Sequence, residues 1–353
     1  MQGIREQKEG PPPEPGFRPA ALAEGWRGVA ELPGLGVWER LRAMAEYVRL
    51  SASRGVTPYE HFKQYRFFEM PRAEQEEFLT FSEAQRITWR LSREIRDVFW
   101  HKDLFNRAFG AFIRRDWMKP APGGEEEFRE LCRRHPQLIV KPSASTEGRG
   151  IRILETGNGA DTDALLRALA EEDAIVEEVL KNDERLAAFN PDSLNTVRVV
   201  TLYDGARFEV YGAAIRFGRR GAAVDNVSSG GLHATLDPAT GKVVTHGKDA
   251  SGNSVAAHPD SGMPFLGFRV PRWEEVLELA RAAVDVLPRT RIAGWDVALP
   301  IDREAALVEG NHMPDFGLLQ YRGAKGIKRD FEAKVRAMFG ERFLDGRGKG
   351  AGR

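Results

Sequence analysis

The chain has 353 residues, and its 52 Lys and Arg balance 52 Asp and Glu, so the formal net charge is zero. A balanced charge excludes an overall field that attracts nucleic acid or anionic lipid, so any anion has to be bound locally. The single cysteine excludes an internal disulfide framework, and neither a secretory leader nor an apolar run of about 18 residues is present. We therefore expect a cytoplasmic protein of about two domains, with no nucleic-acid partner and no membrane insertion.

The first third of the chain is predicted to be mainly helical. Residues 1–20 are rich in proline and polar side chains, which indicates a disordered or strap-like tail. From residue 21 to 120 the apolar residues recur at helical spacing, as in "AQRITWRLSREIRDVFW". The turn-rich stretch "PAPGGEEE", Pro120 to Glu127, suits a boundary.

Strand patterns dominate after this boundary. "QLIVKP" and "GIRIL" flank a loop of small residues, and "AIVEEVL" follows a helical stretch. "TVRVVTLYDGARFEVYGAAIRFG" predicts a hairpin turning at Asp204-Gly205. An amphipathic helix, "PRWEEVLELARAAVDVLP", precedes two last strands, "RIAGWDVALP" and "AALVEG". Adjacent hairpins with few βαβ units favour an α+β fold with antiparallel sheets over a doubly wound sheet.

Lys141 ends a predicted strand, and the loop of small residues from Ser143 to Gly150 follows it. Such a loop lets backbone N–H groups close around phosphate oxygens, and a nearby lysine adds a positive charge. The stretch lacks both the P-loop pattern and the dinucleotide fingerprint. An ordinary hairpin loop is an equally good interpretation.

A hydrophobic strand also runs into two acids, Glu177 and Glu178. Its end offers backbone groups to an adenine edge, and a later carboxylate such as Asp183 suits ribose hydroxyls. A solvated strand end is the alternative.

Two arginines, Arg198 and Arg216, stand in strands that are otherwise apolar. A buried guanidinium needs a partner, which is a protein carboxylate, a phosphate or a substrate carboxylate. The loop just downstream, residues 224–231, supplies Asp225 and Asn226.

The last two predicted strands carry Asp296, Glu309 and Asn311. Residues two apart in a strand share a face, and a short turn at Pro300 to Glu304 would bring Asp296 near the other two. Two carboxylates and an amide oxygen suit magnesium, whereas zinc is a poor candidate because no His or Cys pair has ligand spacing. The alternative is an acid cluster with internal hydrogen bonds. His312 points to the other face and is expected to be structural or to support the metal ligands from behind.

Taken in order, these motifs resemble the ATP-grasp superfamily, and most closely its sugar-transfer-associated branch. The likeness spans roughly residues 95–325 and is carried by "HKDLFNRAF", "IVKPSASTEGRGI", "VEEVLKND", "PDSLNTVRVVTLYDG", "AAIRFGRRGAAVDNVSSGGL", "GWDVAL" and "VEGNHMPDFG". The resemblance implies two α+β lobes that enclose ATP between antiparallel sheets. It assigns residues 121–180 to the small lobe and 181–340 to the large lobe, with a flexible basic tail at 341–353.

The resemblance also implies a role for each candidate residue. Contacts with the nucleotide fall to Lys102 and Lys141 at the phosphates, Ser145, Thr146, Gly148 and Gly150 in the closing loop, Glu178 and Val179 at the adenine hinge, and Asp183 on ribose. The pattern does not separate Asp183 from its neighbour Glu184. One or two Mg²⁺ ions, or Mn²⁺, would bind Asp296, Glu309 and Asn311. Near the transferred phosphoryl group stand Arg198, Arg216 and Asn226.

The function implied is that of an ADP-forming ligase that activates a carboxylic acid as an acylphosphate for attack by an amine or hydroxyl. The branch name hints at decoration of a sugar or surface polymer. Two alternatives stay open, a phosphotransferase that stops at a phosphorylated product and a regulatory module that binds nucleotide without turnover. A complete metal set argues against the regulatory module.

Overall fold

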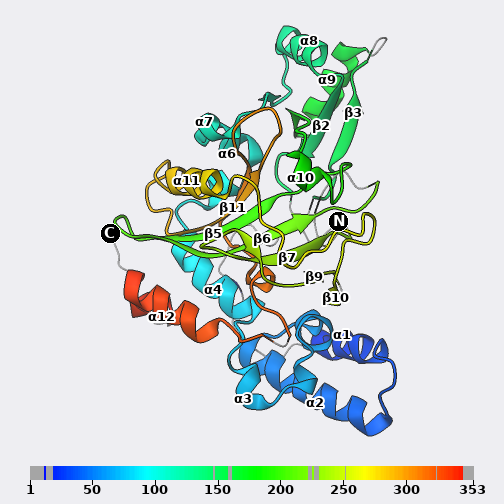
Figure 1. Cartoon of the computed structure of the whole chain (residues 1–353), viewed down its shortest axis with the longest axis vertical. Helices are drawn as coiled ribbons and strands as arrows, with labels where there is room; N and C mark the ends of the chain where they lie inside the picture. Colours follow the sequence, from blue (N-terminus) through cyan, green and yellow to red (C-terminus); the bar gives the residue numbers. More distant parts are fainter. Residues whose placement is uncertain are drawn as a thin grey trace. The chain divides into compact units, whose positions relative to one another are not determined.

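The computed structural model describes Pro12 and residues 19–145, 148–157, 161–221, 225, 230–250, 252–322 and 324–344 (Figure 1). The chain divides into two compact units. Unit 1 comprises Met1–Arg93 and Met313–Arg353, and unit 2 comprises Glu94–His312. This division differs from the predicted ranges, because its first boundary lies at residue 93 rather than 120 and the C-terminal segment groups with the N-terminal region. The predicted tails, 1–20 and 341–353, lie mostly outside the described residues.

Unit 1 is helical. Its elements are α1 (Pro19–Ala30), α2 (Val37–Arg54), η2 (Glu60–Gln64), η3 (Phe67–Glu69), α3 (Arg72–Gln75), α4 (Phe81–Ser92), η5 (Phe316–Leu318), α12 (Lys328–Phe339) and η6 (Glu341–Phe343). Helix α2 ends at Gly55, whose φ of 70° is the left-handed conformation that glycine adopts at little cost. The prediction of a mainly helical N-terminal region is confirmed.

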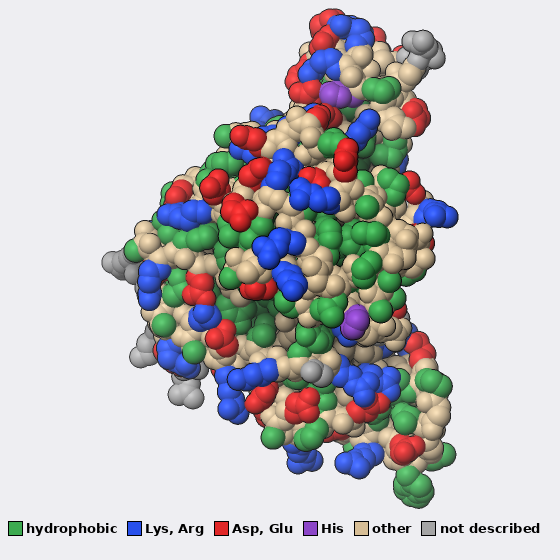
Figure 2. Space-filling view, in the orientation of Figure 1, with side chains coloured by type: hydrophobic (Ala, Val, Ile, Leu, Met, Phe, Trp, Pro, Cys, Tyr) green, Lys and Arg blue, Asp and Glu red, His purple; other side chains and the backbone are tan. Residues whose placement is uncertain are grey.

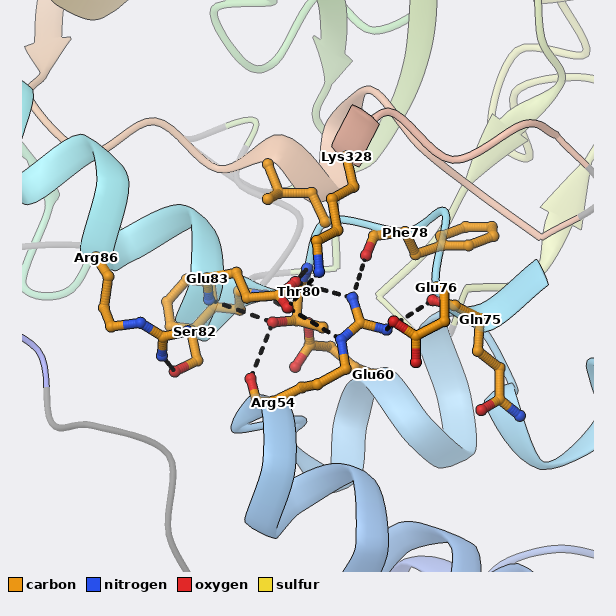
Figure 3. A network of polar contacts seen from close by, with 12 residues as sticks. Arg54, Glu60, Gln75, Glu76, Phe78, Thr80, Ser82, Glu83, Arg86 and Lys328 are labelled. Atoms are coloured by element: carbon orange, nitrogen blue, oxygen red, sulfur yellow. Dashed lines mark hydrogen bonds and ion pairs between the residues drawn. The ribbon is translucent and has the colours of Figure 1, made fainter. Parts of the chain in front are cut away.

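A buried network of charges joins α2, α4 and α12 within unit 1 (Figure 3). The Arg54 guanidinium donates to both carboxylate oxygens of Glu83, at 3.0 and 2.8 Å, and to the backbone oxygens of Gln75 and Phe78. Lys328 Nζ lies 2.8 Å from Glu83 Oε1. One carboxylate therefore fixes both an early helix and the returning C-terminal helix.

Unit 2 begins with short helices and a small antiparallel sheet. The helices are α5 (Arg96–Trp100), α6 (Lys102–Ala108) and α7 (Gly110–Ile113). The sheet has the order β1-β4-β2-β3, formed by β1 (Trp117–Met118), β2 (Gln137–Pro142), β3 (Arg152–Glu155) and β4 (Ala174–Glu178). Helices α8 (Glu125–Arg134) and α9 (Thr162–Glu171) share a hydrophobic core with it, and Cys132 is buried in that core.

A larger antiparallel sheet forms the rest of unit 2. Its strand order is β10-β9-β7-β6-β5-β11-β12, with β8 paired to β7. The strands are β5 (Val197–Tyr203), β6 (Phe208–Phe217), β7 (Leu232–Asp237), β8 (Lys242–Val243), β9 (Gly247–Lys248), β10 (Ser254–Val255), β11 (Ile292–Ala298) and β12 (Ala306–Asn311), and the accompanying helices are α10 (Glu184–Ala187) and α11 (Trp273–Val284). The predicted Asp204-Gly205 hairpin joins β5 to β6. The α+β class with antiparallel sheets is confirmed.

The sheet core is apolar, and α11 packs against it through residues such as Val276 and Ala280. On the face of the molecule in Figure 2, positive and negative side chains are interspersed, in keeping with the zero net charge. Among the described residues, no helix is both long and apolar enough to cross a membrane.

Candidate active site

A row of charged side chains crosses three neighbouring strands of the large sheet. Arg198 on β5 is paired in register with Asp296 on β11, and Asp296 is paired with Glu309 on β12. Directly paired residues have side chains on the same face of a sheet. Arg198 Nη2 donates to Asp296 Oδ2 at 2.8 Å, and its Nε donates to the other carboxylate oxygen. The bidentate pair is fully buried at Asp296.

Arg216 on β6 adds a second cation to the same carboxylate. Its Nη2 donates to Asp296 Oδ2 at 2.7 Å and to Thr196 Oγ1 at 2.8 Å. Burial alone raises the pKa of Asp296, but the charges of Arg198 and Arg216 outweigh it and bring that pKa to about 2. Asp296 is therefore ionised, and it holds both guanidinium groups in place.

Glu309 is the second carboxyl group in the row. Burial raises its pKa, and the neighbouring charge of Asp296 raises it further, while Arg216 opposes both effects. The side chain also shares a hydrogen bond with Asp296. Asn311, two residues on, makes a long 3.4 Å contact from Nδ2 to Gly294 O. Two adjoining carboxyl groups and a nearby amide oxygen thus share one face, where a divalent cation would relieve their repulsion.

The opposite face of β12 is closely packed at Gly310. A Cβ atom there would lie 2.5 Å from Phe105 Cε2 and 2.6 Å from Phe99 Cε1. His312 on the same face is buried against Trp100, with ring centroids 6.4 Å apart, and burial lowers its pKa to about 4. These contacts fix the strand that carries Glu309 and Asn311.

We expect Gly310→Ala to lower the free energy of unfolding by about 1–3 kcal/mol, because the added methyl group overpacks two phenylalanine rings. The matched control is Gly110→Ala, since a Cβ at Gly110 meets nothing within 4 Å. Thermal unfolding of both variants measures the difference. Equal melting temperatures would show that the rings move aside at little cost.

Lys102 connects the small-residue loop with the row of charges. Its Nζ donates to Ser145 O at 2.8 Å and to Ser145 Oγ at 3.2 Å, and its backbone N donates to Ser143 O at 2.9 Å. Burial lowers the pKa of Lys102, and the negative charge of Glu309 counteracts this. The lysine is therefore electrostatically coupled both to the candidate metal ligands and to the loop.

Lys141 is buried and pairs with Glu177, its Nζ lying 2.5 Å from Oε2. Arg115 Nη2 lies 2.7 Å from the other oxygen of Glu177, and Asn106 Nδ2 donates to that oxygen at 2.9 Å. Burial raises the pKa of Glu177, but Arg115 and Lys141 outweigh burial and hold it well below its usual range. Neither Arg115 nor the role of Glu177 was predicted from the sequence. Strand alternation separates Glu177 from Glu178, yet only the pairing of Ile139 with Glu177 brings Glu177 beside Lys141.

A cavity of about 460 Å³ lies at the end of β4, next to this ion pair. Its lining includes Ile139, Lys141, Glu178, Val179, Glu184 and Leu194. The volume suits a small molecule, and the mixture of apolar walls with a few polar groups is typical of ligand pockets. The predicted hinge residues thus border a cavity.

The acids around this cavity differ in what they contact. The Glu178 carboxylate forms a bidentate pair with Arg303 at 2.6 and 2.8 Å, and the Glu178 backbone N–H donates to Asp116 O at 2.8 Å, so the group considered for a ligand is its backbone carbonyl. Asp183 caps α10 by accepting from Arg185 N at 3.0 Å, and it also pairs with the Arg185 guanidinium. Glu184, which the motif did not separate from Asp183, lines the cavity.

Part of the predicted loop lies within the described residues. Gly148 and Gly150 have φ of 69° and 76°, and a Cβ at Gly150 would lie 2.8 Å from Pro142 Cγ. Both positions therefore favour glycine. Thr146 and Asn226 lie outside the described residues. Asp225 is buried and accepts from Thr196 N at 2.8 Å.

His233 on β7 is a further residue of the charged face that was not predicted from the sequence. It is paired in register with Arg216, so both side chains lie on the charged face of the sheet. Its Nδ1 is buried and has no hydrogen-bond partner in the part of the chain that the structure describes. Burial lowers its pKa to about 4, helped by Lys248 and Arg216, so the ring is neutral at pH 7. The sequence signal that could have indicated His233 is a histidine within a strand of mainly apolar residues.

A second group of possible ligands, Asp116, His135 and Glu178, has side-chain atoms within 4.8 Å of one another. Arg134 pairs with Asp116, and Arg303 pairs with Glu178. Two guanidinium groups already balance these carboxylates, so the group is best explained as an ion-pair network.

The solved structures that resemble this chain share little sequence identity with it. The ATP-grasp ligase PsnB complexed with minimal precursor is 15% identical, with 66% of this chain and 57% of that chain covered and a TM-score of 0.39. N5-carboxyaminoimidazole synthetase from Staphylococcus aureus, complexed with ADP, is 9% identical. The match covers 62% of this chain and 46% of that chain, with a TM-score of 0.41. D-alanine-D-alanine ligase from Coxiella burnetii is 11% identical. The match covers 67% of this chain and 52% of that chain, with a TM-score of 0.34. The chain spans about half the length of these proteins.

Among curated proteins no match is found. A family model described as sugar-transfer associated ATP-grasp, however, matches residues 124–334, which is more than half of the chain. The match contains both sheets of unit 2 almost entirely, together with most of the candidate site residues. The resemblance drawn from the motifs is confirmed, and the chain belongs to the sugar-transfer associated ATP-grasp family.

Proposed function

We propose that this protein is an ATP- and magnesium-dependent ligase that joins a small-molecule carboxylic acid to an amine or hydroxyl and forms ADP and phosphate. The observation that carries the proposal is the row Arg198, Asp296 and Glu309, which is electrostatically coupled through Lys102 to the small-residue loop. A binding module has no need for two guanidinium groups oriented beside adjoining carboxylates, whereas phosphoryl transfer does.

The residues fit a nucleotide. The cavity at the end of β4 has the size and the apolar walls for a base and ribose, with backbone groups of Glu178 and Val179 at the adenine edge. Glu184 is a better candidate for ribose than Asp183, because Asp183 is occupied by Arg185. Lys102, Lys141 and the loop with Ser145 and Gly148 would hold the phosphates.

The residues also fit magnesium. Oxygen ligands from Glu309, Asn311 and Asp296 form a hard donor set, and the raised pKa of Glu309 marks a place where a cation favours ionisation. When bound, one or two Mg²⁺ ions would neutralise charge on the β- and γ-phosphates. We propose one or two ions at this site, with Mg²⁺ favoured over Mn²⁺.

In the proposed reaction, a carboxylate oxygen of the acid attacks the γ-phosphorus of ATP, the bond to the β-phosphate oxygen breaks, and ADP leaves. The amine or hydroxyl then attacks the acyl carbon, loses its proton to solvent, and expels phosphate. Arg198 and Arg216 stabilise the negative charge that spreads over the phosphoryl oxygens, and Asp296 orients both forks. No covalent protein nucleophile is needed.

The family description favours an acceptor on a sugar or surface polymer, and the ATP requirement favours the cytoplasm. Asn226 keeps its proposed role near the transferred phosphoryl group.

We expect Arg216→Lys to lower turnover by about 10²-fold or more while nucleotide affinity changes little, because lysine keeps the charge but loses the planar fork. Steady-state ADP release and nucleotide titration measure the two quantities. The matched control is Arg219→Lys, whose guanidinium pairs with Asp260 at 2.8 Å at a partly exposed position. Unchanged turnover in Arg216→Lys would remove this residue from the site.

The reaction class is tested by a screen of carboxylic acids with candidate amines for ADP and phosphate release. Hydroxylamine present in the screen should yield an acylhydroxamate from the productive acid. ADP release without this product would favour phosphotransfer or hydrolysis over the ligase. Nucleotide binding without any ADP release would favour a regulatory module.

A further inference from the structure

Unit 1 contains a second cavity, of about 470 Å³, lined only by residues of that unit. Three arginines line it, Arg42 and Arg49 from α2 and Arg72 from α3. Arg42 and Arg49 are seven residues apart, which places them on the same face of the helix. The volume is in the range of pockets that hold small molecules.

The balance of charge in this cavity is positive. Two glutamates, Glu46 and Glu69, also line it. Glu69, however, already pairs with Arg66 and Arg322, and the hydrogen bond from Arg66 lowers its pKa despite partial burial. Its negative charge is therefore balanced by residues outside the lining.

Two of the lining arginines have unused donors. Among the residues that the structure describes, neither Arg42 nor Arg72 has an ion pair or a side-chain hydrogen bond. Each guanidinium carries five N–H donors in a fixed fork. Both side chains are exposed, so their donors face solvent and are available to a ligand in the cavity.

The third arginine, Arg49, is held in position. The side chain of Gln75 is fully buried; its Oε1 accepts from Arg49 Nη2 at 2.8 Å, and its Nε2 donates to Glu46 Oε1 at 2.8 Å. Arg49 Nε is buried and has no hydrogen-bond partner among the described residues. Leaving such a donor unsatisfied is costly, so a ligand that accepts from it gains binding energy.

Gln75 is itself fixed by the charged network of unit 1. Arg54 Nη1 donates to the Gln75 backbone oxygen at 2.7 Å. Figure 3 shows the Gln75 side chain pointing away from Arg54. The Gln75 side chain, which holds the lining residues Arg49 and Glu46, is therefore fixed in place, and this reduces the entropy lost on binding.

We propose that this cavity binds a small molecule that carries a phosphate group. A dianionic phosphate has three terminal oxygens to accept from several guanidinium groups, and its charge matches the positive excess better than a single carboxylate does. Phe68, stacked under Arg66 at 5.0 Å, provides an apolar wall for the uncharged part of the ligand. The proposal does not depend on the ligase reaction, since no residue of the candidate active site takes part.

The test is calorimetric titration of the full-length protein at low salt, without nucleotide or magnesium. The probes are glucose 6-phosphate, inorganic phosphate, glucose and succinate. We expect glucose 6-phosphate to bind, and the double variant Arg42→Gln/Arg72→Gln to weaken this binding at least about 10-fold, because two charge-assisted donors are lost. Arg42→Lys/Arg72→Lys, which retains both charges, should bind with intermediate affinity.

The matched control is Arg27→Gln/Arg86→Gln, which removes the same charge from unit 1 outside the cavity. The lysines of the active site also attract phosphate, so the difference between the two double variants measures the cavity. Equal weakening in both would overturn the proposal, as would no binding of either phosphate probe up to about 10 mM. Glucose or succinate binding as tightly as glucose 6-phosphate would overturn the assignment to phosphate.

Discussion

Glu309→Ala is expected to reduce ATP turnover by about 10³-fold, the largest functional effect that we predict for a single substitution. Both oxygens of Asp296 already accept hydrogen bonds from Arg198 and Arg216. Glu309 then has to supply most of the negative charge that a divalent cation requires. ADP release measured across a magnesium titration should show a lost or strongly shifted dependence on the metal.

The fold should survive this change. Without Glu309, Asp296 keeps both arginine partners, and a carboxyl group whose pKa is raised by burial is removed. Glu304→Ala is the matched control, because Glu304 lies just before β12 with a largely exposed side chain that pairs with Arg114 at 2.9 Å. Normal turnover and an unchanged magnesium dependence in Glu309→Ala would contradict the metal assignment, whereas a lower melting temperature would point to a structural role.

Glu83→Gln is expected to destabilise unit 1 by about 3 kcal/mol, the largest effect on stability that we predict. The carboxylate joins Arg54 and Lys328 in a nearly dry environment (Figure 3). Burial alone raises the pKa of Glu83, but the two cations outweigh it and lower that pKa from 4.5 to about 2. A shift of this size corresponds to about 3 kcal/mol, and removing one partner of a buried pair typically costs 3–5 kcal/mol.

The effect has a defined pH dependence. Because the folded pKa lies below the unfolded value, the stabilisation is complete above pH 4.5 and is lost as the pH falls from 4.5 toward 2. Native-state hydrogen exchange of amides in α4 and α12 resolves the free energy within unit 1. Glu83→Gln should lose stability at pH 7 and show a flatter acid limb.

Glu341→Gln is the control for this experiment. Glu341 pairs with Arg336, and both side chains are half exposed, so its loss should have a far smaller effect than that of Glu83. Similar effects for the two substitutions would show that the buried network contributes no more than an exposed ion pair.

Features formed by residues close together in the sequence could be predicted, whereas contacts between residues far apart in the sequence could not. The Asp204-Gly205 hairpin was predictable because turn residues and strand alternation act over a few positions. The neighbourhood of Asp296 and Glu309 was predictable for the same reason, since only a short turn separates β11 from β12. The alternation of side chains along each strand then determines which of them share a face.

Other features depend on which distant strands pair, and in what register. Arg216 contacts Asp296 although 80 residues separate them, and Arg115 meets Glu177 across 62 residues. No local pattern specifies such a partner, because the desolvation and Coulomb energies that select it exist only after the sheets have formed. The grouping of α12 with the N-terminal helices through Lys328 and Glu83 is another case.

The sequence by itself determined the antiparallel α+β class, the helical N-terminal region, the family motifs and the candidate metal ligands, because these follow from periodicity, turn chemistry and residue type. Only the tertiary structure decided that Asp296 is held by two arginines, that Glu177 rather than Glu178 pairs with Lys141, and that a cavity with unused arginine donors lies in unit 1. The physical reason is that a charged side chain needs a partner only once it is buried, and which side chains are buried together is decided by the assembled chain.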